Sequence, residues 1–146
     1  MRRTWVAVAA VGVLAGAAGA ALWARRQLVL VTVEGTSMTP TLRHGDRVLV
    51  RRRGPERVRH GDIVVLEPPV TLTSPDDKTR WNVKRVVAMP GDPVTPGDVP
   101  AGGPDVVPPG KLVVRGDGQV SSDSRTWGFY AADALLGVVI RQVGQR

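Results

Sequence analysis

The sequence contains no cysteine, so it can form neither a disulfide framework nor a thiolate metal site. Aromatic residues make up only 4% of the chain, and they do not alternate with basic residues as they do on many nucleic-acid-binding surfaces. Its histidines, His44 and His60, each precede a Gly-Asp pair and fit turns better than a metal site. We therefore expect no metal, no cofactor and no nucleic-acid partner.

Acidic residues are also scarce, since 13 of them face 20 basic residues and leave a net charge of +7. Part of the excess lies in arginine pairs that flank an uncharged segment, residues 4–24. As a helix, a segment of this length spans roughly 30 Å, the thickness of a bilayer core. Trp5 and Trp23 lie near its ends, where interfacial tryptophans are enriched. These features favour a membrane anchor over residues 1–26.

Two other interpretations of the N-terminal segment stay open. It can be a signal peptide that is removed at the small residues Ala18-Gly19-Ala20, or a buried core helix. The arginines on both sides of the segment give no clear orientation by the positive-inside rule.

Residues 27–146 read as one domain of short strands separated by Gly-Asp and proline turns, which predicts an all-β barrel or folded sheet. Residues 68–77 and 93–109 are expected to be loops, and residues 131–135 a short helical turn. The expected strands cover residues 27–33, 47–51, 63–66, 83–88, 111–115 and 136–143.

Ser37 and Lys84 are the candidate catalytic residues. A serine hydroxyl becomes a good nucleophile when a neighbouring base takes its proton. A lysine can be that base only if burial lowers its pKa toward neutrality. In a strand, Lys84 would share an apolar face with Val86 and Ala88, while Arg85 points the other way. Taken singly, these positions are better explained by an ordinary turn serine and a solvent-facing lysine.

Four short motifs give these residues a context. Residues 37–42 read Ser-Met-Thr-Pro-Thr-Leu, residues 45–48 Gly-Asp-Arg-Val, and residues 84–92 Lys-Arg-Val-Val-Ala-Met-Pro-Gly-Asp. The fourth motif has two parts: residues 116–118 read Gly-Asp-Gly, and residues 121–128 read Ser-Ser-Asp-Ser-Arg-Thr-Trp-Gly. In this order, the motifs resemble those of the type I signal peptidases, the membrane-bound serine–lysine proteases that remove signal peptides.

The resemblance covers most of the chain beyond residue 30. It implies an all-β, signal-peptidase-like catalytic domain with one N-terminal transmembrane helix. The protein would lie in the cell membrane as a single-pass protein, with its catalytic domain on the extracytoplasmic side.

The resemblance also implies roles for individual residues. Ser37 would be the nucleophile and Lys84 the general base. Ser121 would orient Lys84 through a hydrogen bond, while Asp123 and Arg125 would brace the site through an ion pair.

Leu42 and Val83 match positions that line shallow substrate pockets, which admit small residues before the cut and exclude larger ones by sterics. Gly35 stands where some family members have a serine that helps to hold the oxyanion, and other members have glycine there too. The departure from the family pattern lies in the last motif. Gly118 replaces an asparagine, and the spacer before Ser121 is one residue shorter, which could shift Ser121 relative to Lys84.

The sequence thus predicts a membrane-anchored serine endopeptidase that cleaves signal peptides from exported precursor proteins, with those peptides and the lipid membrane as its partners. A processing peptidase dedicated to one exported precursor or leader peptide is an alternative. So is a catalytically inactive, membrane-tethered binding module. A self-cleaving repressor also uses serine and lysine, but it needs a DNA-binding domain, and the sequence shows no motif for one.

Overall fold

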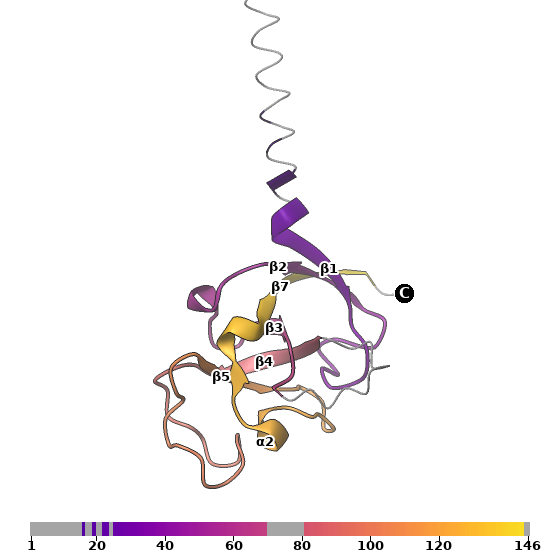
Figure 1. Cartoon of the computed structure of the whole chain (residues 1–146). Helices are drawn as coiled ribbons and strands as arrows, with labels where there is room; N and C mark the ends of the chain where they lie inside the picture. Colours follow the sequence, from indigo (N-terminus) through magenta and orange to yellow (C-terminus); the bar gives the residue numbers. More distant parts are fainter. Residues whose placement is uncertain (1–15, 17–18, 20–21, 24, 70–80, 145–146) are drawn as a thin grey trace, which may run out of the picture.

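The computed structural model describes residues 16, 19, 22–23, 25–69 and 81–144. Within them, the chain forms a curled, antiparallel sheet with the strand order β1-β2-β7-β3-β4-β5-β6 (Figure 1). The strands are β1 (Leu28–Thr32), β2 (Arg47–Arg51), β3 (Ile63–Leu66), β4 (Asn82–Ala88), β5 (Lys111–Arg115), β6 (Tyr130–Ala131) and β7 (Leu135–Gly144). The expected all-β folded sheet is confirmed.

Short helices complete the fold. Two are 3-10 helices, η1 (Pro55–Arg57) and η2 (Ala132–Ala134), and one is an α-helical turn, α2 (Ser124–Trp127). The helical turn expected at residues 131–135 is η2. Asp123 caps the N-terminus of α2, because its carboxylate accepts a hydrogen bond from the Arg125 N–H.

Strand β7 joins the two halves of the sheet. Its first residues pair with β3, and its later residues pair with β2. The register shifts along both pairings, which is the signature of β-bulges that bend a strand. This bend curls the sheet, so that β1 and β2 lie at one end of it and β4 and β5 at the other (Figure 1).

Strand β3 is buried on both of its faces. Val64 packs in a core cluster with residues of β4, β5 and β6, while the next residue, Val65, packs in a second cluster with Val48 and Val50 of β2. Burial on both faces explains why residues 63–66 read as a continuous apolar run without alternation. The second cluster also contains Met38 and therefore lies directly beneath the segment that carries Ser37.

The expected membrane anchor, residues 1–26, falls mostly outside the described residues, and so does most of the expected loop at 68–77. In the part of the chain that the structure does describe, no helix has both the length and the apolar character that crossing a membrane requires. The division into an anchor and a catalytic domain therefore stays a prediction.

Candidate active site

Ser37 lies in a tight turn that follows β1. The turn is closed by hydrogen bonds from the Thr39 N–H to the Thr36 carbonyl oxygen (3.0 Å) and from the Leu42 N–H to the Met38 carbonyl oxygen (2.9 Å). Met38 and Leu42 hold it in place, because their side chains are 1% and 3% exposed in the core cluster below. Met38 is therefore buried in the core, while Ser37, the residue before it, is half-buried at the surface.

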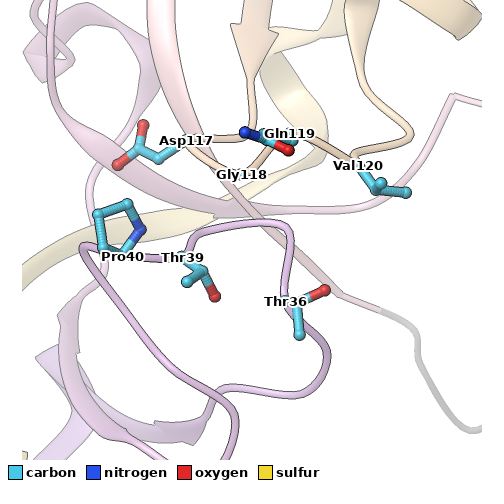
Figure 2. Close-up of a pocket in the computed structure, with 7 residues that line it drawn as sticks. All are labelled: Thr36, Thr39, Pro40, Asp117, Gly118, Gln119 and Val120. Atoms are coloured by element: carbon cyan, nitrogen blue, oxygen red, sulfur yellow. The ribbon is translucent and has the colours of Figure 1, made fainter.

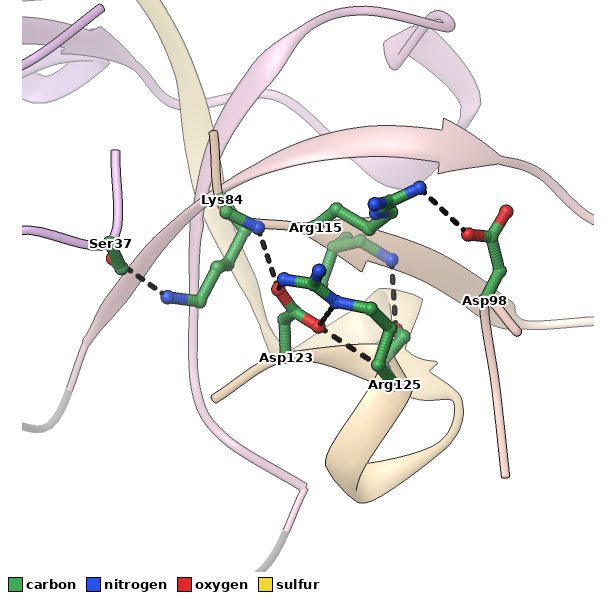
Figure 3. A network of polar contacts seen from close by, with 9 residues as sticks. Ser37, Lys84, Asp98, Arg115, Asp123 and Arg125 are labelled. Carbon is green, nitrogen blue, oxygen red and sulfur yellow. Dashed lines mark hydrogen bonds and ion pairs between the residues drawn. The ribbon is translucent and has the colours of Figure 1, made fainter. Parts of the chain in front are cut away.

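Lys84 comes to the same point from the middle of β4. The strand alternates as expected, with Lys84, Val86 and Ala88 buried and Arg85 and Val87 less so. The Lys84 side chain is only 4% exposed, and its Nζ donates a hydrogen bond to Ser37 Oγ at 2.9 Å (Figure 3). An amine this close to a hydroxyl can accept the hydroxyl proton once the amine itself is neutral.

The surroundings of Lys84 favour the neutral amine. Burial lowers the pKa of Lys84 below its usual value, because an ammonium loses its hydration there. The Asp123 carboxylate opposes this change and the Arg125 guanidinium adds to it. The net result is a lowered pKa, which is the property that a lysine base requires.

Asp123 is fully buried and heavily hydrogen-bonded. Its carboxylate accepts a hydrogen bond from the Gly116 N–H (2.8 Å). It also accepts hydrogen bonds from Arg125 Nε and Nη2 (2.9 and 2.7 Å), which Figure 3 shows. Burial alone would raise the pKa of Asp123, but the hydrogen bonds from Arg125 and Gly116 outweigh it and hold that pKa well below its usual range. The expected ion pair between Asp123 and Arg125 is therefore present.

The segment 116–118 lies directly against the main chain at Ser37. The Gly118 N–H donates a hydrogen bond to the Ser37 carbonyl oxygen at 2.8 Å. A Cβ on Gly118 would lie 2.6 Å from the Thr36 carbonyl oxygen, and a Cβ on Gly116 would lie 2.4 Å from that of Ser37. Both distances are shorter than any side chain tolerates, so this contact requires glycine at both positions. The Ser37 N–H makes no hydrogen bond with the described residues, and it can donate to an oxyanion.

Ser121 does not hydrogen-bond to Lys84 in the described structure. Its Oγ is buried and has no hydrogen-bond partner there. It lies against Gly116, since a Cβ built on that glycine would come close to Ser121 Oγ. This placement is in line with the shorter spacer before Ser121, and the expected role of Ser121 stays a prediction.

A hollow of about 530 Å³ opens beside the Ser37 turn (Figure 2). The residues expected to line substrate pockets are not among those that line it. Leu42 is buried in the core cluster with Met38, and the half-buried Val83 packs against the same cluster. The lining residues are Thr36, Thr39, Pro40, Asp117, Gly118, Gln119 and Val120.

An arginine–aspartate pair, which the sequence interpretation did not anticipate, supports the segment 116–118. Arg85 follows Lys84 and points away from it, and its Nε and Nη2 donate to the two Asp117 carboxylate oxygens at 2.8 and 2.6 Å. Both residues belong to the recognised motifs, so the sequence did single out each of them. Their pairing depends on how the strands are placed, which the motifs do not reveal.

His44 has a structural contact that was also missed. Its Nδ1 accepts a hydrogen bond from the Gly35 N–H at 3.1 Å, which ties the two ends of the Ser37 turn together. Among the described residues, no group of three or more His, Asp or Glu side chains is arranged to hold a metal ion.

The comparisons with known proteins agree with this architecture. The family model "Signal peptidase, peptidase S26" matches residues 2–100, so the chain belongs to this family, which is one of serine peptidases. The matched range includes both Ser37 and Lys84.

Curated relatives carry related names. The chain is 32% identical to a probable signal peptidase I-1 of Synechocystis sp. over 130 residues, which are 72% of this chain and 65% of the relative. It is 29% identical to signal peptidase IB of Staphylococcus aureus over 148 residues, with 74% of this chain and 73% of the relative covered. A signal peptidase I of Bacillus licheniformis is 41% identical over 64 residues, which are 42% of this chain and 31% of the relative. The chain thus spans less than two thirds of the length of the Synechocystis and Bacillus relatives.

Proposed function

We propose that this protein is a membrane-anchored serine endopeptidase that cleaves signal peptides from exported precursor proteins, with Ser37 as the nucleophile and Lys84 as the general base. The observation that carries the proposal is the 2.9 Å contact between Ser37 Oγ and the Nζ of a lysine that is only 4% exposed. The names of the curated relatives support signal peptides as the substrates.

The reaction follows from the positions of the two residues. Neutral Lys84 accepts the Ser37 proton as Oγ attacks the carbonyl carbon of the scissile bond. The oxyanion that forms is stabilised by the Ser37 N–H, and one donor of this kind contributes about a hundredfold or more in rate. The Lys84 ammonium then protonates the leaving amine, and an ester remains on Ser37. A water molecule, deprotonated by Lys84, hydrolyses this ester and restores both residues.

The neighbouring residues have supporting roles in this proposal. Asp123 and Arg125 set the charge around Lys84 through their ion pair. Ser121 is proposed to orient Lys84, on the ground of its motif and of the buried position of its hydroxyl. Leu42 and Val83 are proposed to limit the substrate to small residues before the cut.

The membrane location is part of the proposal too. Residues 1–26 would anchor residues 27–146, the catalytic domain, on the extracytoplasmic side of the cell membrane. The support is the uncharged segment 4–24 with its flanking arginines and tryptophans, and membership of the family.

Cleavage of precursors that carry an Ala-x-Ala site tests the proposal. The detergent-solubilised full chain would be compared with Ser37→Ala, Lys84→Met and the control Lys111→Met, which replaces a half-buried lysine at the start of β5. The product ends would be identified by mass spectrometry. We expect the wild type and the control to cut after the site, and both dyad variants to be inactive.

The other outcomes separate the alternatives. If Ser37→Ala still cuts, Ser37 is not the nucleophile. If the wild type is inert on a panel of unrelated precursors, general signal-peptide cleavage is ruled out, and a dedicated peptidase or an inactive binding module takes its place.

A further inference from the structure

The turn that carries Ser37 has two different sides. Met38 and Leu42 point into the core cluster, against which Val83 also packs. Thr36, Thr39 and Pro40 line the hollow, and residues 117–120 line it from across the opening (Figure 2). Gly118, which lines the hollow, is hydrogen-bonded to the Ser37 carbonyl oxygen, so the hollow borders the turn that carries the nucleophile.

The lining suits a peptide better than a small polar or ionic ligand. Pro40 and Val120 offer apolar surface, and Thr36, Thr39 and Gln119 offer hydrogen-bonding groups. Asp117 adds no free charge, because both of its carboxylate oxygens accept hydrogen bonds from Arg85. A volume of about 530 Å³ falls within the range of ligand sites, roughly 300–1,000 Å³.

The walls of the hollow are held in place before any ligand arrives. The Arg85–Asp117 pair (2.8 and 2.6 Å) fixes one wall, and the 2.8 Å hydrogen bond from Gly118 to Ser37 joins it to the other. A ligand therefore does not have to order these segments, which favours binding.

We propose that this hollow binds the residues that follow the scissile bond, the first residues of the released mature protein. The inference rests on the proposed function. A peptide whose scissile carbonyl lies at Ser37 Oγ leaves the nucleophile in two opposite directions. The half before the cut is assigned to the side of Leu42 and Val83, neither of which lines the hollow. The half after the cut then lies in the hollow. The residues that line the hollow therefore contribute to the choice of cutting site.

A charge-swap experiment at Val120 tests the assignment. This side chain is 83% exposed, so charged substitutions leave the fold intact. The full chain with Val120→Glu or Val120→Lys would be compared with the wild type and with the control Val106→Glu, which alters a 50% exposed valine that does not line the hollow. The substrates would be one pair of peptides with Lys or Glu as the second residue after the cut, and a second pair with the same residues at the second position before it.

We expect Val120→Glu to raise the ratio of kcat/KM for the peptide with Lys after the cut to kcat/KM for the peptide with Glu there. The expected change is about two- to fivefold, the size of effect that an exposed charge pair has. Val120→Lys should reverse this preference. For both Val120 variants, the preference between Lys and Glu before the cut should equal that of the wild type. For Val106→Glu, the preferences before and after the cut should both equal those of the wild type. High salt should reduce the effect.

Two results would overturn the inference while the proposed function stands. In one, an active enzyme shows no change of preference at Val120. In the other, the change concerns the residues before the cut, which would place the signal-peptide side in the hollow. A wild type that cuts none of the peptides is a separate result, and it rejects the proposed function together with this inference.

Discussion

Lys84 Nζ and Ser37 Oγ lie 2.9 Å apart, although 47 positions separate the two residues in the chain. Lys84 is fixed in the middle of β4, and Ser37 is fixed by the burial of Met38 beside it. A buried ammonium in this position is unfavourable, and among the described residues Asp123 is the carboxylate that attracts it. In the proposed mechanism, this contact would serve chemistry at the expense of stability, a common relation at active sites.

Lys84→Met should abolish peptidase activity and raise stability at neutral pH by about 1 kcal/mol, because methionine fills the same space and does not have to lose a proton when the chain folds. The pKa of Lys84 is lowered in the folded state, so between that pKa and 10.5 the unfolded chain binds a proton that the folded chain does not. Wild-type stability therefore rises with pH across this interval, and the advantage of the variant shrinks.

Urea unfolding of both proteins at pH 7 and pH 10 measures this difference. A variant that is less stable than the wild type at pH 7 would show that the lysine is well solvated or well paired in the folded protein.

Asp123→Asn and Arg125→Gln should move the acidic limb of the pH–rate profile in opposite directions. That limb reports the pKa of Lys84, which must be neutral to act. The Asp123 carboxylate raises this pKa and the Arg125 guanidinium lowers it. Asp123→Asn is therefore expected to shift the limb to lower pH, and Arg125→Gln to higher pH. Measurement of kcat/KM against pH for both variants checks the prediction, and parallel shifts would contradict it.

Asp123→Asn should also destabilise the fold by about 2–3 kcal/mol, since it removes the buried carboxylate that pairs with Arg125 and accepts the Gly116 N–H. The wild-type pKa of Asp123 is lowered, so this contribution is present above about pH 4, the range of an ordinary carboxyl of pKa 3.8, and disappears as the pH falls through the lowered folded-state pKa. Thermal unfolding of the variant and the wild type from pH 7 into strong acid measures this, with convergence of the two curves expected only in acid.

Gly118→Ala should lower kcat by about ten- to a hundredfold, because small displacements of a catalytic group have large effects on rate. Its Cβ would lie 2.6 Å from the Thr36 carbonyl oxygen and would push the Ser37 turn away from Lys84. Gly103→Ala is the matched control, since its nearest contact would be an ordinary 3.7 Å. Steady-state kinetics of both variants decide the matter, and equal kcat values for the two would contradict the prediction.

Alternation and turn residues were sufficient to predict six strands, because each has a clear apolar run. The predicted bounds 47–51, 63–66 and 111–115 coincide with β2, β3 and β5. Strand β6 and helix α2 were missed, since a strand of two residues and a helix of four are too short to show a period.

The sequence predicted the residues of the site that belong to local motifs, but not the contacts between them. The motifs singled out Ser37 and Lys84, but the hydrogen bond between them and the Arg85–Asp117 pair arise from the way distant segments meet. The role of Gly118 also arises from the way distant segments meet. In the sequence, Gly118 was only a departure from the family pattern. In the structure it is one of two glycines, with Gly116, whose main chain packs directly against the nucleophile turn.

The central claim is that Lys84 is neutral at working pH and can take the Ser37 proton. NMR titration of protein labelled with ¹³C at lysine Cε tests it most directly, because the chain has only three lysines, Lys78, Lys84 and Lys111. Loss of one signal in Lys84→Met assigns the resonance. We expect the Lys84 signal to titrate below 10.5, the usual pKa of a lysine. A Lys84 signal that titrates at or above 10.5 would contradict the claim, because an ammonium at working pH cannot accept the serine proton.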